Sequence, residues 1–160
     1  MLGEKANILL VDDRPENLLA LEGILEDENY GLFKATSGRE ALRMVLKHDF
    51  DLILLDVQMP GMDGFETAQL IHGKKGVKHI PIIFITAISK EQKYIHKGYE
   101  VGAENYLFKP IDPDELKSKL KTSLDYHRYK QQMELLGKRT TEAKQRRLLK
   151  HRNGVSSPQQ

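Results

Sequence analysis

The chain has 160 residues and a formal net charge of +2, and its composition is 39% hydrophobic and 30% charged. These proportions are ordinary for a globular protein, and the length allows one domain with a substantial core plus an appendage. No apolar run approaches the roughly 20 residues that span a bilayer, and the first residues lack the pattern of a signal peptide. Cysteine is absent, which excludes disulfides and thiolate metal sites. We therefore expect a cytoplasmic protein with no membrane partner.

The two parts of the chain carry opposite charge. Residues 1–114 contain 13 Lys and Arg against 19 Asp and Glu, a balance of −6, whereas residues 115–160 contain 12 against 4, a balance of +8. The sequence therefore predicts an acidic globular part followed by a basic tail, and we expect the two parts to do different jobs.

Five short apolar runs alternate with segments of helical spacing. The runs are continuous, as is typical of parallel strands that are buried on both faces. Ser37, Ser89 and Asp112 stand where helix N-caps are expected. This alternation predicts a doubly wound α/β domain, with helices on both faces of a parallel sheet. The predicted strands are 7–13, 31–35, 51–56, 80–86 and 105–109, and the predicted helices are 15–28, 37–46, 64–74, a fourth from Ser89 and a fifth from Pro113.

The last predicted helix is unusually long. Helix-compatible sequence runs from Pro113 to about Arg152 without a proline, and only Gly137 interrupts it. We expect three segments: a globular domain over 5–124, a basic helical extension over 125–152 that acts as a linker or coiled coil, and a disordered tail over 153–160.

Apolar residues of the extension follow the three-four spacing of a coiled-coil seam from Tyr126 to Leu136. Thr140, Ala143 and Arg147 then take the same positions, and they would pack poorly in such a seam. The pattern is compatible with a homodimer formed through this helix, and equally with a solvated basic helix that is partly frayed.

Asp56 ends the third apolar run, where an unpaired buried charge would be costly. Its presence indicates that something at the strand end offsets negative charge. Asp12 and Asp13 end the first run, and ligands of open parallel sheets bind beyond the carboxyl ends of the strands. Carboxylates that meet there repel one another unless a cation neutralises them. Hard oxygen ligands that are partly solvated suit Mg²⁺.

Two further strand ends carry matching chemistry. The fourth run ends in Thr86, which supplies a hydroxyl, and the fifth ends in Lys109 and Pro110, which supply an ammonium. A metal, a hydroxyl and an ammonium around one carboxylate make a site that stabilises a phosphoryl group. This combination indicates that Asp56 is the nucleophile that accepts it.

Together these motifs resemble the signature of the response-regulator receiver domain of two-component signalling, the CheY-like superfamily. The resemblance covers roughly residues 5–124 and implies a flavodoxin-like, five-stranded parallel sheet in the order 2-1-3-4-5. It also implies a phosphorylation-activated switch that receives its phosphoryl group from a histidine kinase or a histidine phosphotransfer protein. No enzyme activity is implied beyond the domain's own phosphorylation and dephosphorylation. The motifs are Asp12-Asp13, Asp56 followed by VQMPGMDG, Thr86-Ala87 and Lys109-Pro110.

The resemblance implies a metal site and a phosphoacceptor. Asp56 is the phosphorylated residue. Asp13, Asp56 and the backbone carbonyl of Gln58 ligate Mg²⁺ directly, and Asp12 acts mainly through water. The hydroxyl of Thr86 hydrogen-bonds a phosphoryl oxygen, and Lys109 pairs with the phosphoryl group.

The resemblance also implies a switch and a water path. Tyr106 matches the family's switch aromatic, which turns inward when the threonine moves, so that the output runs through the fourth helix, the fifth strand and the fifth helix. Gln58 and Ile88 flank the path of the water that hydrolyses the acyl phosphate, and apolar Ile88 predicts slow self-dephosphorylation. The Lys109–Pro110 peptide bond is expected to be cis.

Parts of the sequence are also typical of other classes of protein. A phosphohydrolase of the haloacid-dehalogenase type also uses a strand-end Asp, but it requires a second Asp two residues later, where this chain has Gln58. Nucleic-acid binding through KRTTEAKQRRLLKHR (residues 138–152) would be salt-sensitive and non-specific, and no recognition motif accompanies it. The chain could equally be the amino-terminal receiver part of a larger hybrid kinase or output protein.

Overall fold

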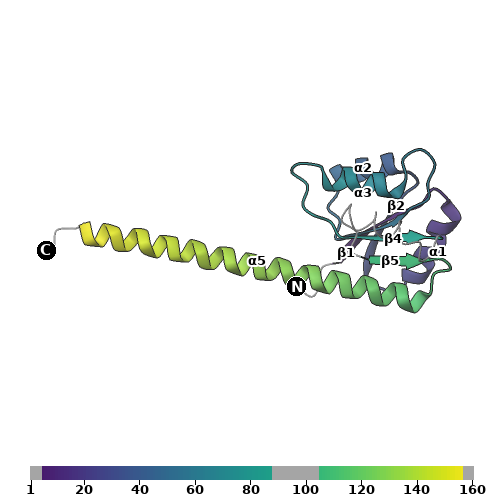
Figure 1. Ribbon diagram of the computed structural model, residues 1–160. Coiled ribbons are helices and arrows are strands. Elements are labelled where there is room, and N and C mark those ends of the chain that lie inside the picture. The colour runs from purple at the N-terminus through teal and green to yellow at the C-terminus, as the bar shows by residue number, and fades with distance from the viewer. Residues whose placement is uncertain (1–4, 88–104, 157–160) are drawn as a thin grey trace. The chain divides into compact units, whose positions relative to one another are not determined.

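The computed structural model describes residues 5–87 and 105–156 (Figure 1). Within these residues, no helix is both long enough and apolar enough to cross a bilayer. The elements in chain order are β1 (Ala6–Val11), α1 (Pro15–Leu25), β2 (Tyr30–Ala35), α2 (Gly38–Lys47), β3 (Leu52–Asp56), α3 (Gly64–His72), β4 (Ile82–Thr86), β5 (Asn105–Phe108) and α5 (Pro113–Ser156).

The strands form one parallel sheet in the order β2-β1-β3-β4-β5, as predicted. Val11, the last residue of β1, lies opposite Leu55 of β3, so Asp12 and Asp56 leave the sheet at the same level. Asp56 lies opposite Ile85, the penultimate residue of β4. The register therefore aligns the carboxyl ends of the three central strands at one edge.

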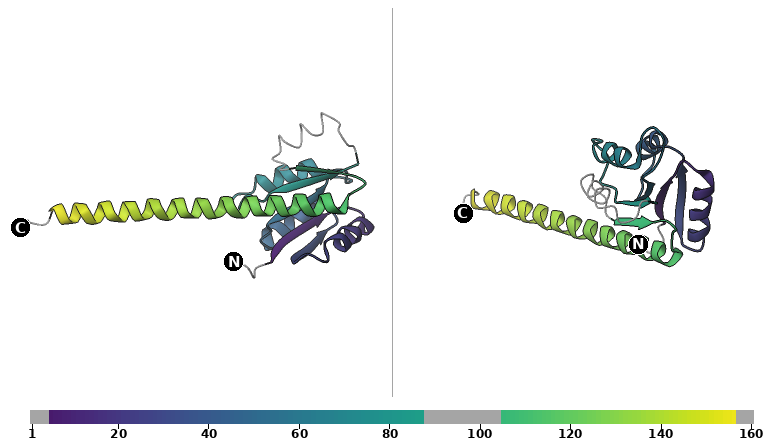
Figure 2. Two further views of the ribbon diagram at one scale, coloured as in Figure 1. Left: turned by 90° about the horizontal axis from the view of Figure 1, so that it is seen from below. Right: turned by 45° about the vertical axis from the view of Figure 1, so that its right-hand side comes forward.

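Helices cover both faces of the sheet. Figures 1 and 2 show α2 and α3 on one face, and α1 with the first turns of α5 on the other. Each helix layer closes a separate core, because the side chains of a buried parallel strand point alternately to the two faces. One core joins residues such as Leu9 and Phe84 to Val45 and Phe65 of α2 and α3. The other joins strand residues such as Leu10, Leu54 and Ile83 to Leu21 of α1 and Leu120 of α5.

Local signals explain where the helices begin. The hydroxyl of Ser37 accepts a hydrogen bond from the N–H of Glu40, as the predicted N-cap of α2 should. Asp63 and Glu66 form a reciprocal capping box at the start of α3. The sequence analysis placed the start of α3 correctly but overlooked this box. Pro113 opens α5 after the turn in which the side chain of Asp112 accepts from the N–H of the second helical residue.

Several boundaries differ from the predicted ones. The strand β1 ends at Val11, so Asp12 and Asp13 follow the strand rather than end it. The helix α1 ends at Leu25, because its next residues form a turn in which the N–H of Glu28 bonds to the carbonyl of Leu25. The predicted fourth helix, from Ser89, lies outside the described residues.

The chain divides into two compact units, Met1–Leu124 and Asp125–Gln160, and the division falls within α5. In the second unit, no described side chain over 125–150 is buried. The backbone stays helical to Ser156, so the first four residues of the predicted disordered tail are helical, and the last four lie outside the described residues. The helix continues there because the next proline comes only at Pro158.

Candidate functional site

Three carboxylates meet at the carboxyl edge of the sheet. One oxygen each from Asp12, Asp13 and Asp56 lies within 4.8 Å of the others. Asp12 and Asp56 are buried, with exposed fractions of 2% and 3%, whereas Asp13 is half-buried. The register of β1 and β3 produces this meeting, because the two strands are neighbours and end level with each other. The sequence analysis predicted the cluster correctly.

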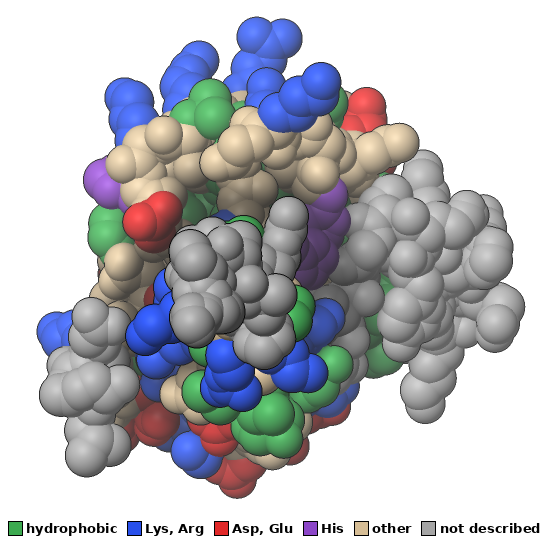
Figure 3. All heavy atoms as spheres, turned by 90° about the vertical axis from the view of Figure 1, so that its left-hand side faces the viewer, with side chains coloured by type: hydrophobic (Ala, Val, Ile, Leu, Met, Phe, Trp, Pro, Cys, Tyr) green, Lys and Arg blue, Asp and Glu red, His purple; other side chains and the backbone are tan. Residues whose placement is uncertain are grey.

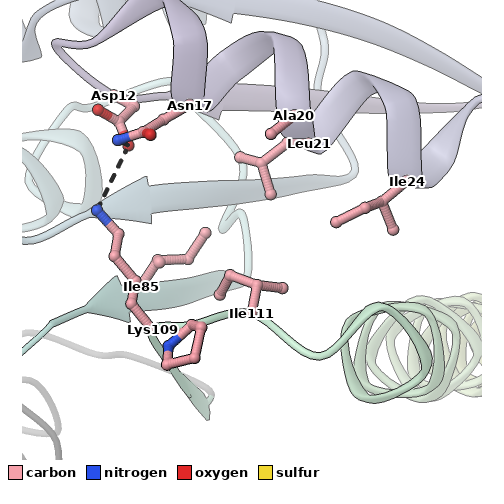
Figure 4. A pocket seen from close by; sticks show the side chains of 9 residues that line it. Asp12, Asn17, Ala20, Leu21, Ile24, Ile85, Lys109 and Ile111 are labelled. Atoms are coloured by element: carbon pink, nitrogen blue, oxygen red, sulfur yellow. Dashed lines mark hydrogen bonds and ion pairs between the residues drawn. The ribbon is translucent and has the colours of Figure 1, made fainter.

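Lys109 supplies a cation to this cluster. Its Nζ lies 3.1 Å from Oδ1 of Asp56 and 3.8 Å from Oδ2 of Asp12, and the second contact is drawn in Figure 4. The N–H of Lys109 donates to the carbonyl of Thr86, which ties the residue to the end of β4. The Lys109–Pro110 peptide bond is cis, as expected.

Asp56 is an unusual carboxylate within this cluster. Burial raises its pKa from 3.8 to about 6, and the neighbouring carboxylates of Asp12 and Asp13 add to the rise in pKa, while Lys109 opposes it. The Oδ1 atom of Asp56 is buried, and its partner among the described residues is the Lys109 ammonium, with which it forms an ion pair. A buried oxygen in this state can accept a further positive partner.

A cleft of about 380 Å³ opens beside Asp56. The three carboxylates, Gln58 and Lys109 all line it, which places five predicted site residues together. Three carboxylates supply hard oxygen donors within 4.8 Å of one another, and Gln58 lines the same cleft, so the residues present fit a magnesium ion.

Thr86 and Tyr106 lie near the cleft but are not among the described residues that line it. Thr86 is buried at the end of β4, and its neighbour Ala87 lines the cleft instead. Tyr106 is only 4% exposed and packs against Phe84, with ring centroids 5.6 Å apart. The ring is therefore turned inward. Ile88, predicted to shield the water path, lies outside the described residues.

The sequence analysis did not identify Asn17. Its Nδ2 donates to Oδ2 of Asp12 at 3.1 Å, and the N–H of Arg14 donates to Oδ1 of the same residue at 2.9 Å. These bonds orient Asp12 toward the cleft. Asp12 does not cap α1, whose N-cap is Arg14 without a side-chain hydrogen bond. An amide placed one turn into the helix after the acidic pair is the signal that could have pointed to Asn17.

Gly64 keeps the loop after β3 close to the site. A Cβ atom at this position would collide with the carbonyl oxygen of Asp56 and with the backbone of Val57. The N–H of Gly64 donates to the carbonyl of Val57 at 2.9 Å. This close approach is the physical reason for a glycine at position 64.

A second cavity of about 290 Å³ adjoins the cleft (Figure 4). It lies between α1 and the residues that follow β5, and it shares Asp12, Asn17 and Lys109 with the cleft. The rest of its lining is mainly apolar, with side chains such as Leu21 and Ile111.

Comparisons with known proteins agree with this geometry. The chain matches the model of the response regulator receiver domain over residues 8–121. It is 43% identical over 107 residues to response regulator PleD of Caulobacter vibrioides, which covers 67% of this chain and 23% of that protein. It is 39% identical over 120 residues to transcriptional regulatory protein ResD of Bacillus subtilis, which covers 75% of this chain and 48% of that protein. The chain thus spans less than half the length of both relatives.

Solved structures show the same fold. The chemotaxis protein CheY4 of Vibrio cholerae matches with a TM-score of 0.70 and 34% identity, covering 75% of this chain and 99% of that one. The signal receiver domain of an HD domain-containing protein from Pseudomonas fluorescens Pf-5 matches with a TM-score of 0.74 and 27% identity, covering 82% of this chain and 96% of that one. The chain therefore belongs to the response-regulator receiver-domain family.

Proposed function

We propose that Asp56 is the phosphoacceptor of this phosphorylation-activated switch. The observation that carries the proposal is the position of its Oδ1 atom, which is buried and has the Lys109 ammonium, 3.1 Å away, as its partner among the described residues. A nucleophilic carboxylate needs an oxygen that is not already committed to donors, together with positive charge to receive the incoming phosphoryl oxygens. Asp56 has both.

Asp12, Asp13 and Asp56, with the backbone carbonyl of Gln58, would hold Mg²⁺ in this cleft. Receiver domains bind this ion at an acidic pocket, and the three carboxylates here form one. When bound, the ion offsets charge on the carboxylates and on the phosphoryl group. Asp12 acts mainly through water, and the hydrogen bonds from Asn17 and Arg14 hold its carboxylate in place.

The proposed reaction moves one phosphoryl group. An oxygen of Asp56 forms a bond to phosphorus while the bond between phosphorus and the donor nitrogen breaks, and that nitrogen keeps the electron pair. The product is an acyl phosphate. Lys109 pairs with the transferred group, and the Thr86 hydroxyl donates to one of its oxygens. Gln58 lies on the path of the water that later hydrolyses the acyl phosphate, and Ile88 is proposed to shield it.

We propose that the donor is a histidine kinase or a histidine phosphotransfer protein, as for receiver domains in general. The chain would then act in the cytoplasm and catalyse only its own phosphorylation and dephosphorylation. The receiver domain would occupy residues 5–124, and the basic extension over 125–152 would pass its state onward. A homodimer through the extension is one means of doing so.

The proposed switch uses Tyr106. Thr86, once drawn to the phosphoryl oxygen, leaves space that favours the inward position in which the ring of Tyr106 lies. The Nζ of Lys119 in α5 donates to the carbonyl of Tyr106 at 2.7 Å, and Glu115 holds the same ammonium at 3.3 Å. This contact joins the switch strand to the first turns of α5, which supports an output that runs through that helix.

Phosphorylation in vitro tests the proposal. The wild-type protein, incubated with a small phosphodonor, should become labelled when Mg²⁺ is present and remain unlabelled in its absence. Asp56→Asn should abolish labelling, Asp13→Asn should raise the Mg²⁺ concentration that is required, and Lys109→Gln should slow labelling. Asp49→Asn is the matched control, because Asp49 is exposed in the loop before β3. Full labelling of Asp56→Asn would refute the assignment.

A further inference from the structure

Six exposed cations lie on α2 and on the loop that follows α3. The residues that face the sheet from α2 include Ala41 and Val45. Figure 3 shows Lys and Arg side chains at the top of the view, with an acidic side chain beside them, and in Figure 1 α2 and α3 lie at the top. The set, here named the α2 basic face, consists of Arg39, Arg43, Lys47, Lys74, Lys75 and Lys78, and all six side chains are exposed.

These cations outnumber the nearby acids, which are Glu40, Glu66 and the exposed Asp49 that lines the same groove as Lys47 and Lys78. Glu40 accepts hydrogen bonds from the N–H and hydroxyl of Thr36, and Glu66 accepts from the N–H of Asp63 in the α3 capping box. Among the described residues, none of the six cations forms an ion pair with a carboxylate. The face is therefore a positive patch on a part of the chain whose balance is negative.

Two exposed leucines accompany the cations. Leu46 of α2 is 61% exposed and Leu70 of α3 is 45% exposed, and they are two of the three large hydrophobic side chains exposed among the described residues of the first unit. Leu46 also lines a groove of about 310 Å³, together with Lys47 and Lys78. Leu46 thus shares one groove with two of the cations.

We infer that the α2 basic face is a peripheral binding surface for a membrane of anionic lipids. Lysine and arginine ammonium and guanidinium groups attract lipid phosphates, while exposed leucines enter the boundary between headgroups and acyl chains. Arg39, Arg43 and Lys47 follow one another at every fourth position of α2, so they form one row along the helix. A nucleic-acid backbone would use the same cations, but it gives no role to exposed leucines, because single-strand binders add stacking aromatic side chains.

The position of this surface is compatible with signalling. The groove beside Lys47 and Lys78 lies before the amino ends of β3 and β4, whereas the acidic cleft lies at their carboxyl ends. Contact with a lipid surface at the Lys47 and Lys78 end of the α2 basic face would leave Asp56 open to a donor. The expectation of no membrane partner rested on the lack of a spanning segment, and that lack does not bear on peripheral contact.

Vesicle sedimentation of the full chain tests the inference. The protein should bind vesicles that contain phosphatidylglycerol and should not bind vesicles of phosphatidylcholine alone, and added salt should release it. Each cation near an anionic surface contributes about fivefold to partitioning. Arg43→Gln, Lys47→Gln and Lys75→Gln together should therefore lower binding about a hundredfold. Leu46→Ser with Leu70→Ser should lower binding severalfold while leaving its salt dependence unchanged.

The basic extension provides the control. Lys138→Gln, Arg139→Gln and Lys144→Gln remove the same charge from exposed positions of α5, which also carries exposed leucines, and they should lower binding less than the first triple variant does. An equal loss in the two triple variants would overturn the inference, because binding would then follow net charge alone. A different outcome would assign the face to nucleic acid instead. In that case the protein would bind duplex DNA more tightly than anionic vesicles at the same phosphate concentration, and the first triple variant would lose this binding.

Discussion

Asp56→Asn should stabilise the protein when metal is absent. The ionised carboxylate is unfavourable in the fold, because burial and the nearby carboxylates raise the pKa of Asp56 from 3.8 to about 6. One pKa unit corresponds to about 1.4 kcal/mol, so ionised Asp56 costs about 3 kcal/mol of folding free energy. An asparagine has the same shape and cannot ionise. Its amide makes a poorer partner for Lys109, so we expect a net gain of about 2 kcal/mol.

The gain should depend on pH in a defined direction. The pKa of Asp56 in the fold lies above its value of 3.8 in the unfolded chain. Its contribution to stability is therefore fully present below pH 3.8 and is lost as the pH rises through about 6. The difference in free energy of unfolding between Asp56→Asn and wild type should be constant above about pH 7 and should disappear near pH 3.8.

Urea unfolding followed by circular dichroism at pH 4, 6 and 8, with a chelator present, measures this difference. Saturating Mg²⁺ should narrow it at pH 8, because the ion binds the folded wild type better than the folded variant. Asp49→Asn, which removes an exposed carboxylate, should stay within about 0.5 kcal/mol of wild type. Equal unfolding midpoints for wild type and Asp56→Asn at pH 8, or a less stable variant, would refute the reasoning.

Three further predictions concern the loop, the extension and the switch. Gly64→Ala should lower the free energy of unfolding by about 2 kcal/mol or more and slow labelling, because the new methyl group meets the backbone of Asp56; Gly23→Ala, with open space around it, is the control, and equal behaviour of the two would contradict the collision. Gly137→Ala should increase helical ellipticity and stabilise α5 by about 1 kcal/mol, since nothing surrounds that position; an unchanged signal would argue against a continuous helix. Tyr106→Ala should weaken any change in self-association on phosphorylation while leaving labelling of Asp56 intact, as measured by sedimentation, and loss of labelling would show that Tyr106 acts in the site itself.

The acidic cluster could be predicted because its residues follow strands. Parallel strands end at the same edge of a sheet, so Asp12, Asp56 and Lys109 fall at one edge once their runs are identified as strands. Their identity as a group came from spacing along the chain, and the neighbouring positions of β1 and β3 came from the family resemblance. The structure adds the distances, which show that these side chains are close enough together to form one site.

Other features could not be derived from the pattern. The bond from Asn17 to Asp12 depends on how α1 approaches the sheet, and the bond from Lys119 to the carbonyl of Tyr106 depends on how α5 packs on the edge strand. Each of these residues looks like an ordinary surface side chain in sequence. The α2 basic face could not be predicted for the same reason. Lys47 and Lys78 are 31 positions apart in the chain and share a groove only in the fold.

The most direct test of the central claim is to locate the phosphoryl group. Wild-type protein labelled by a small phosphodonor in Mg²⁺ should gain the mass of one phosphoryl group, and peptide mapping after chemical reduction of the acyl phosphate should place the modification at Asp56. The label should be absent from the Asp56→Asn protein treated in the same way. Modification at Asp12, Asp13 or a histidine in the wild-type protein, with Asp56 unmodified, would contradict the account.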